Sequence, residues 1–124
     1  MEIIKIINEQ YHAKEDGTPL YPERYDWVND FDEGIAIVEK DDKWWHIDKQ
    51  GKALYKERYD WVDDFSKGIA IVRKNKKFWH IDKKGKALYK ERYVWVDYYI
   101  DEEIARVEKD DKWWHINKQG KIVD

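Results

Sequence analysis

The chain has 124 residues, a net charge of −3, no cysteine, and acidic and basic residues mixed along its whole length. This length fits one domain, the absence of cysteine excludes disulfides and thiolate metal sites, and no basic face points to nucleic acid as a partner. Charged residues make up 41% of the sequence, yet eight Trp, nine Tyr and three Phe can bury enough area to build a core.

The apolar segments are short, with four or five residues in the longest runs. A helix that spans a bilayer needs about 20 apolar residues, so we expect no membrane-spanning segment and no membrane partner. The first residues, Met1-Glu2-Ile3-Ile4-Lys5, lack the charged and then apolar pattern of a secretion signal. The expected location is therefore the cytoplasm.

A repeat of 34 residues runs through the chain. Tyr21, Tyr55 and Tyr89 recur at this spacing, and each is followed by Glu-Arg-Tyr and then by Trp-Val. Residues 19–52 match residues 53–86 at 24 of 34 positions. The next interval has one extra residue, within 99–103. We expect a single repeat domain, 1–124, with a degenerate first unit and a truncated last one. The four units lie near residues 1–33, 34–67, 68–102 and 103–124.

Each unit is expected to contain short strands in a meander, as the second unit illustrates. Residues 34–38 and 44–48 are predicted strands, joined at Asp41-Asp42 by a two-residue turn, since Asp tolerates a positive φ. Gly51 then stands where the next turn requires a left-handed residue. The other units place Gly17, Gly85 and Gly120 at this position. Residues 53–55 and 59–62 are further candidate strands.

The predicted turn at Asp41-Asp42 fixes the register of the hairpin. Val38 should face Trp45, and Ala36 should face Ile47, which makes one face of the hairpin wholly apolar. We assign this face to the core. Its equivalents are Ala70, Val72, Trp79 and Ile81, and then Ala105, Val107, Trp114 and Ile116. The opposite face is mixed, and we expect the neighbouring unit to cover half of it. That face carries Ile35, Ile37, Trp44, His46 and Asp48.

The same residues carry a family pattern. In this sequence it is Gly34-Ile35-Ala36-Ile37-Val38, Lys43-Trp44, Ile47-Asp48-Lys49-Gln50-Gly51-Lys52, Tyr59-Asp60-Trp61-Val62 and Asp64-Phe65-Ser66-Lys67-Gly68. The chain thereby resembles the WG-repeat (KWG-repeat) proteins of bacteria over nearly its whole length, although Trp replaces the family's Gly at Trp45, Trp79 and Trp114. The resemblance implies a β-rich interaction repeat with no general enzymatic activity.

We expect an all-β fold in which tandem β-hairpin repeats stack as an open solenoid. The atypical first and last units favour this arrangement, because terminal repeats usually act as caps. A closed, propeller-like ring is the alternative, since the chain holds four units.

The histidines are the first candidates for chemistry. His46-x-Asp48 and His80-x-Asp82 place two ligand-type side chains on one strand face, which would suit a metal site or a general base with an orienting carboxylate. A position that recurs in every unit usually serves the fold. We therefore favour a His that packs beside Trp and bonds to a neighbouring turn. The last unit has His115-x-Asn117.

The charged motifs are also given structural interpretations. Asp41-Asp42 is predicted to be a solvated turn, because a calcium loop needs more oxygen ligands at fixed spacing. Arg24, Arg58 and Arg92 are expected to pair with acidic residues of adjacent units in preference to an anionic ligand. No catalytic triad, phosphate loop or acid pair is present, so we predict no enzymatic activity, no cofactor and no metal site.

Trp27, Trp61 and Trp95 are the candidate ligand-binding residues. Each precedes a Val, so strand alternation turns one member of each pair away from the core. A row of exposed rings would suit a peptide or sugar rings, whereas buried rings would form a second small core. We predict a non-enzymatic interaction or scaffolding module whose partner is an unknown protein or peptide, with glycan binding as the alternative.

Overall fold

The computed structural model describes residues 2–101 and 103–123, and the described part is all-β, without a helix. Met1, Glu102 and Asp124 lie outside it, as does part of the extra segment at 99–103. No described segment therefore offers the long apolar helix that crossing a bilayer requires. The chain forms two compact parts, Met1–Tyr59 and Asp60–Asp124. From here on, a unit is one of these two parts, and a repeat is one copy of the 34-residue pattern.

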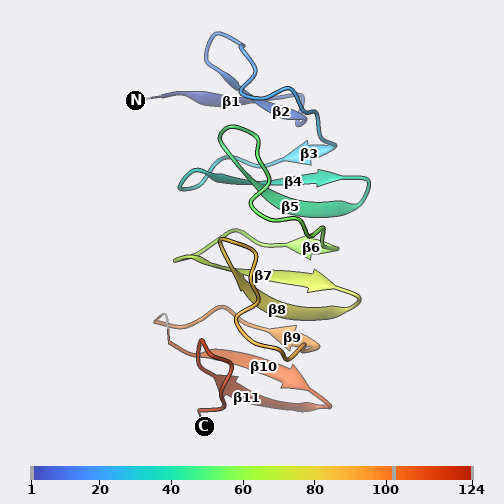
Figure 1. Ribbon diagram of the computed structural model, residues 1–124, viewed down its shortest axis with the longest axis vertical. Helices are drawn as coiled ribbons and strands as arrows, with labels where there is room; N and C mark the ends of the chain where they lie inside the picture. Colours follow the sequence, from blue (N-terminus) through green and yellow to red (C-terminus); the bar gives the residue numbers. More distant parts are fainter. Residues whose placement is uncertain (1, 102, 124) are drawn as a thin grey trace. The chain divides into compact units, whose positions relative to one another are not determined.

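The first unit contains two antiparallel sheets (Figure 1). One sheet pairs β1 (Ile4–Ile7) with β2 (Tyr11–Lys14). The other has the order β3-β4-β5, with β3 (Trp27–Val28), β4 (Ile35–Lys40) and β5 (Lys43–Asp48).

The second unit contains two three-stranded antiparallel sheets (Figure 1). Their strands are β6 (Trp61–Val62), β7 (Ile69–Lys74) and β8 (Lys77–Asp82), then β9 (Trp95–Val96), β10 (Ala105–Lys109) and β11 (Lys112–Ile116). None of the sheets formed by described residues closes on itself. The tandem all-β repeats thus confirm the predicted fold class, and they are consistent with the open solenoid.

The strand pairing differs from a simple meander in two places. Residues 53–55 form no strand, and only an isolated bridge joins Ile47 to Ala53. The Trp-Val strand pairs with the hairpin that follows it, as Val62 faces Val72 in β7. The first strand of each three-stranded sheet therefore belongs to one 34-residue repeat, and the hairpin of that sheet belongs to the next repeat.

The hairpin turns follow the sequence prediction. Asp41 and Asp42 have φ values of 52° and 65°, the left-handed pair expected of a type I′ turn. Asn75-Lys76 and Asp110-Asp111 repeat this geometry. Such a turn allows only one register, and Val38 faces Trp45 while Ala36 faces Ile47, as predicted.

The core lies on the predicted face and extends beyond it. Ala36, Val38 and Ile47 are completely buried, whereas Trp45 is half-buried. Part of the opposite face is more deeply buried than expected, because Ile37 and His46 are also buried. A strand buried on both faces stabilises the sheet through apolar area on each side, which explains how short strands suffice.

Candidate functional site

The three candidate tryptophans occupy the same position in three sheets. Trp27, Trp61 and Trp95 are the first residues of β3, β6 and β9, and the valine that follows each is at most 2% exposed. Val therefore faces the core, and Trp lies on the opposite side of the sheet. Trp95 is 46% exposed, whereas Trp27 and Trp61 are half-buried.

In the first unit, the row continues across the sheet. Trp27 faces Glu39 in β4, and Glu39 faces Trp44 in β5. The rings of Trp27 and Trp44 lie 5.5 Å apart and are tilted by 52°. Trp44 thus extends the candidate surface.

In the second unit, the first sheet repeats this pattern with different residues. Trp61 faces Arg73, and Arg73 faces Phe78. Phe78 makes edge contacts with Trp61 at 6.4 Å and with Trp95 at 5.3 Å, so one ring bridges the two sheets. The Arg73 guanidinium lies 5.8 Å from the centre of the Phe78 ring.

The last sheet ends the row with its most exposed ring. Trp95 faces Glu108, and Glu108 faces Trp113, which is 55% exposed. Arg106 lies 4.8 Å over Trp113 and donates a hydrogen bond of 3.0 Å to Glu108. The Trp95 indole donates to the Asp97 carboxylate at 3.0 Å.

The sequence identified half of this surface. The hairpin register already placed Trp44 on the mixed face with His46, but Trp44, Phe78 and Trp113 were not recognised as site residues. What was missing was the partner of the Trp-Val strand, since that pairing alone brings Trp61 beside Phe78. We call these residues the aromatic row of each unit. The row of the first unit consists of Trp27 and Trp44, and that of the second consists of Trp61, Phe78, Trp95 and Trp113.

The recurring histidines have structural partners. In His80, which is fully buried, Nε2 lies 2.9 Å from the Asp97 carbonyl oxygen and Nδ1 lies 2.6 Å from the Tyr89 hydroxyl. A carbonyl oxygen only accepts, so Nε2 carries the proton, and Nδ1 accepts a hydrogen bond from Tyr89. His12 is held in the same way by Asn29 and Tyr21. These bonds join His12 and His80 to the backbone just after β3 and β9, the first strands of the sheets that follow.

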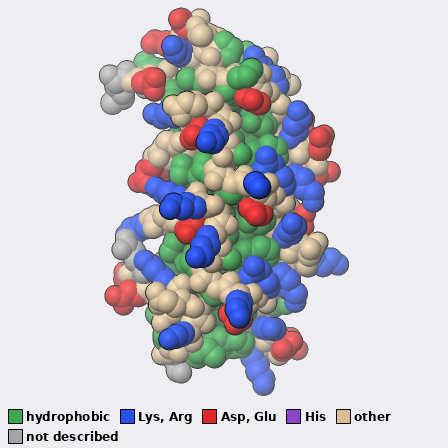
Figure 2. All heavy atoms as spheres, viewed as in Figure 1, with side chains coloured by type: hydrophobic (Ala, Val, Ile, Leu, Met, Phe, Trp, Pro, Cys, Tyr) green, Lys and Arg blue, Asp and Glu red, His purple; other side chains and the backbone are tan. Residues whose placement is uncertain are grey.

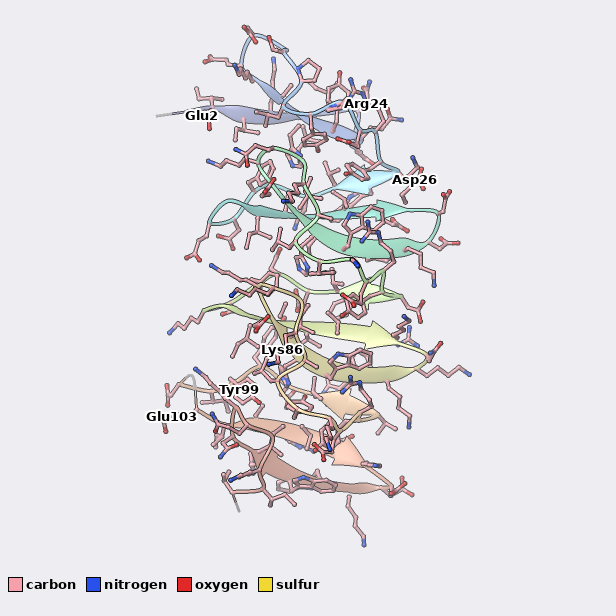
Figure 3. All side chains as sticks on the ribbon, in the orientation of Figure 1. Glu2, Arg24, Asp26, Lys86, Tyr99 and Glu103 are labelled. Atoms are coloured by element: carbon pink, nitrogen blue, oxygen red, sulfur yellow. The ribbon has the colours of Figure 1, made fainter. Side chains whose placement is uncertain are left out.

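This arrangement supports the structural interpretation of the His motif. Both ring nitrogens of His80 are engaged. The ring of Tyr99, labelled in Figure 3, lies 4.6 Å from the His80 ring, in place of the Trp expected beside it. Asp82 does not orient His80, because its Oδ1 accepts from the backbone N–H groups of Lys84 and Lys86. Among the described residues, no three His, Asp or Glu side chains form a group that could hold a metal ion.

The buried histidines should make the chain less stable as the pH is lowered. Burial lowers the pKa of His80 from 6.5 to about 4. Between these values the unfolded chain binds a proton that the folded chain does not, so the free energy of unfolding should be about 2 kcal/mol lower at pH 5 than at pH 7. Urea unfolding at both pH values measures this loss. His80→Gln cannot titrate, and an equal pH dependence in that variant would contradict the assignment.

The repeated arginines also have a structural role, which differs from the expected ion pairs. Nη1 of Arg24, labelled in Figure 3, donates to the carbonyl oxygens of Tyr21, Pro22 and Glu23 at 3.2, 3.0 and 2.9 Å. Its guanidinium lies 3.7 Å from the centre of the Tyr11 ring. Arg58 and Arg92 repeat these bonds and lie 4.0 Å over Trp45 and Trp79. Each arginine therefore fixes the short segment that ends at it, residues 21–24, 55–58 and 89–92, which we call the corner of each repeat.

The surface around these elements carries both charges. Figure 2 shows Lys and Arg side chains intermingled with Asp and Glu, with hydrophobic side chains between them. Some of the acidic groups hold turns, since Asp26 accepts a hydrogen bond from the Asp41 amide at 2.9 Å. The Asp41-Asp42 segment is thus tied to the preceding corner through its backbone.

Comparison with known proteins identifies the repeat. A family model described as a WG-containing repeat matches residues 14–44, 47–78 and 81–113, which together exceed half of the chain. No curated protein gives a detectable match.

Proposed function

Since the chain belongs to the family of WG-containing repeats, we propose that it is a non-enzymatic interaction module that binds a segment of another protein through its aromatic row. The observation that carries this proposal is the exposure, in the second unit, of Trp95, which contacts Phe78, and of Trp113. Exposed aromatic rings offer a large apolar area at a low entropic cost, and they dominate many protein interfaces. The proposal places the module in the cytoplasm and assigns it no cofactor, metal, nucleic acid or membrane.

The tilt of the rings favours a peptide over a glycan. Trp61 and Trp95 meet Phe78 at interplanar angles of 69° and 64°, so ring edges and faces alternate along the row. A sugar stacks on a flat exposed ring face, and a tilted neighbour restricts access to such a face. Apolar side chains of a peptide can instead insert between tilted rings, as they do in aromatic clusters of protein cores.

The charged residues between the rings provide polar contacts for a peptide. Arg73 lies between Trp61 and Phe78, and Glu108 lies between Trp95 and Trp113. Both side chains are half-buried, and a bound segment would remove more water from them. An opposite charge on that segment would then be favoured and a like charge disfavoured, which makes binding selective. The row therefore combines apolar area with one charge in each sheet.

Selection from a random peptide display library on the immobilised chain tests the proposal. We expect enriched sequences with aromatic residues, and we expect Trp95→Ala to weaken binding of a selected peptide tenfold or more, or about 1.4 kcal/mol. Ile3→Ala is the control, because Ile3 is exposed to a similar degree, 53% against 46%, and lies outside the row. Equal binding by Trp95→Ala would contradict the proposal. A glycan array that retains the chain through Trp95, without peptide enrichment, would establish the carbohydrate alternative.

A further inference from the structure

The five arginines of the chain differ in what their guanidinium groups contact. Three of them donate to carbonyl groups of their own corners, and Arg106 donates to the Glu108 carboxylate at 3.0 Å. Arg73 is the exception, because no group within residues 2–101 and 103–123 accepts a hydrogen bond from its guanidinium or forms an ion pair with it. A guanidinium carries its N–H donors in a planar fork that matches a carboxylate. Arg73 can therefore receive a carboxylate from a ligand.

The surroundings of Arg73 favour such a contact. Arg73 is half-buried on β7, faces Trp61 on one side and Phe78 on the other, and holds its guanidinium 5.8 Å from the centre of the Phe78 ring. Cross-strand neighbours on one face lie about 5 Å apart, so a carboxylate bound to Arg73 would lie beside both rings. The rings keep water away from part of the ion pair, which strengthens it by lowering the local dielectric constant.

The other sheet of the second unit compensates its own charge. Glu108 occupies the position of Arg73 between two tryptophans, but Arg106 lies two residues before it on the same face of β10 and is bound to it. The equivalent of Arg106 in β7 is Ile71, a buried residue without charge. A bound segment would thus meet Glu108 as half of an ion pair and Arg73 as a cation without a counterion among the described residues.

We infer that the aromatic row of the second unit binds acidic segments, and that Arg73 selects them. An Asp or Glu side chain of the bound segment pairs with the Arg73 guanidinium, while neighbouring apolar side chains of that segment pack against Trp61 and Phe78. A Lys or Arg at the same place in the segment is rejected, because it would meet a like charge. This inference rests on the proposed function, to which it adds the charge of the partner and the residue that recognises it.

The first test compares random peptide display selections on the unmodified chain and on Arg73→Glu. Glutamate fits this position of the sheet, since Glu108 occupies its equivalent. The unmodified chain should enrich peptides in which Asp or Glu lies near an aromatic residue, and Arg73→Glu should enrich Lys or Arg there instead. Aromatic peptides with no excess of acidic residues would overturn this inference and leave the proposed function standing. The absence of any enriched peptide would contradict both.

The second test measures affinities by fluorescence anisotropy. The probes are one selected acidic peptide, acetylated and amidated so that only its side chains are charged, and a copy with Lys in place of the acidic residue. The unmodified chain should prefer the acidic peptide at least tenfold. Arg73→Gln should abolish this preference, and Arg73→Glu should reverse it. Thermal melts verify that both variants are folded.

Lys74→Glu is the matched control, because it changes the net charge of the chain as much as Arg73→Glu does. Lys74 is the next residue of β7, is exposed, and projects from the opposite face of the sheet. This variant should keep the preference for the acidic peptide to within about threefold, since only the general field of the protein changes. If Lys74→Glu abolished the preference as completely as Arg73→Glu, net charge alone would explain it, and the role of Arg73 would be refuted.

Discussion

Replacing Trp79 by alanine should lower the free energy of unfolding by about 3–5 kcal/mol. Trp79 is 8% exposed, faces Val72 across the strands, and carries the Arg92 guanidinium 4.0 Å over its ring. Its removal leaves a cavity in the core and an arginine without its stacking partner. Urea unfolding of the variant at pH 7 measures the loss.

The matched variant is Trp61→Ala, which removes the same side chain from the aromatic row of the same unit. Trp61 is half-buried and makes one edge contact with Phe78 at 6.4 Å, so its loss should cost about 1 kcal/mol. Peptide binding should suffer more than stability. If Trp61→Ala unfolds the chain as severely as Trp79→Ala, the row belongs to the core, and the proposed binding surface is wrong.

Gly51→Ala should destabilise the chain strongly for so small a substitution. Gly51 has a φ of 83°, and a Cβ atom there would lie 2.5 Å from Cβ of Tyr21, an atom that no side-chain rotation can move. The left-handed backbone costs alanine about 1–2 kcal/mol, and the collision adds about 1–3 kcal/mol. Thermal unfolding should show a correspondingly lower melting temperature.

Gly34→Ala separates these two effects. Gly34 lies in the same unit with a nearly identical φ of 82°, but nothing stands within 4 Å of the added Cβ atom. The free energy of unfolding of this variant should therefore fall by only about 1–2 kcal/mol, the cost of the backbone strain alone. Equal melting temperatures for the two variants would show that Tyr21 does not pack on Gly51 as described.

The predictions that depended on local geometry are the ones the structure confirms. A two-residue turn at Asp41-Asp42 admits only one register, so the core residues of the hairpin followed from the sequence. The pairing of Trp61-Val62 could not be predicted, because two residues have no periodicity and their partner depends on the path of the corner before them. The candidate site was therefore found only in part.

The polar network inside the repeats was also beyond the sequence. His80 and Tyr89 are nine residues apart and meet only because the intervening turn folds back on the strand. Arg92 directly follows Glu91 in a chain rich in acidic residues, which made ion pairs the natural expectation. Its guanidinium instead satisfies carbonyl groups of a corner that the sequence pattern does not reveal.

The central strand of each three-stranded sheet carries a charge between two aromatic rings, and its sign changes from sheet to sheet. The residue is Glu39 in the first unit, and Arg73 and then Glu108 in the second. The rings and the apolar face stay nearly constant around it, so this position can mutate without refolding the repeat. Under the proposed function, exchanging one such residue changes the charge that a bound segment meets in one sheet and leaves the surrounding scaffold intact.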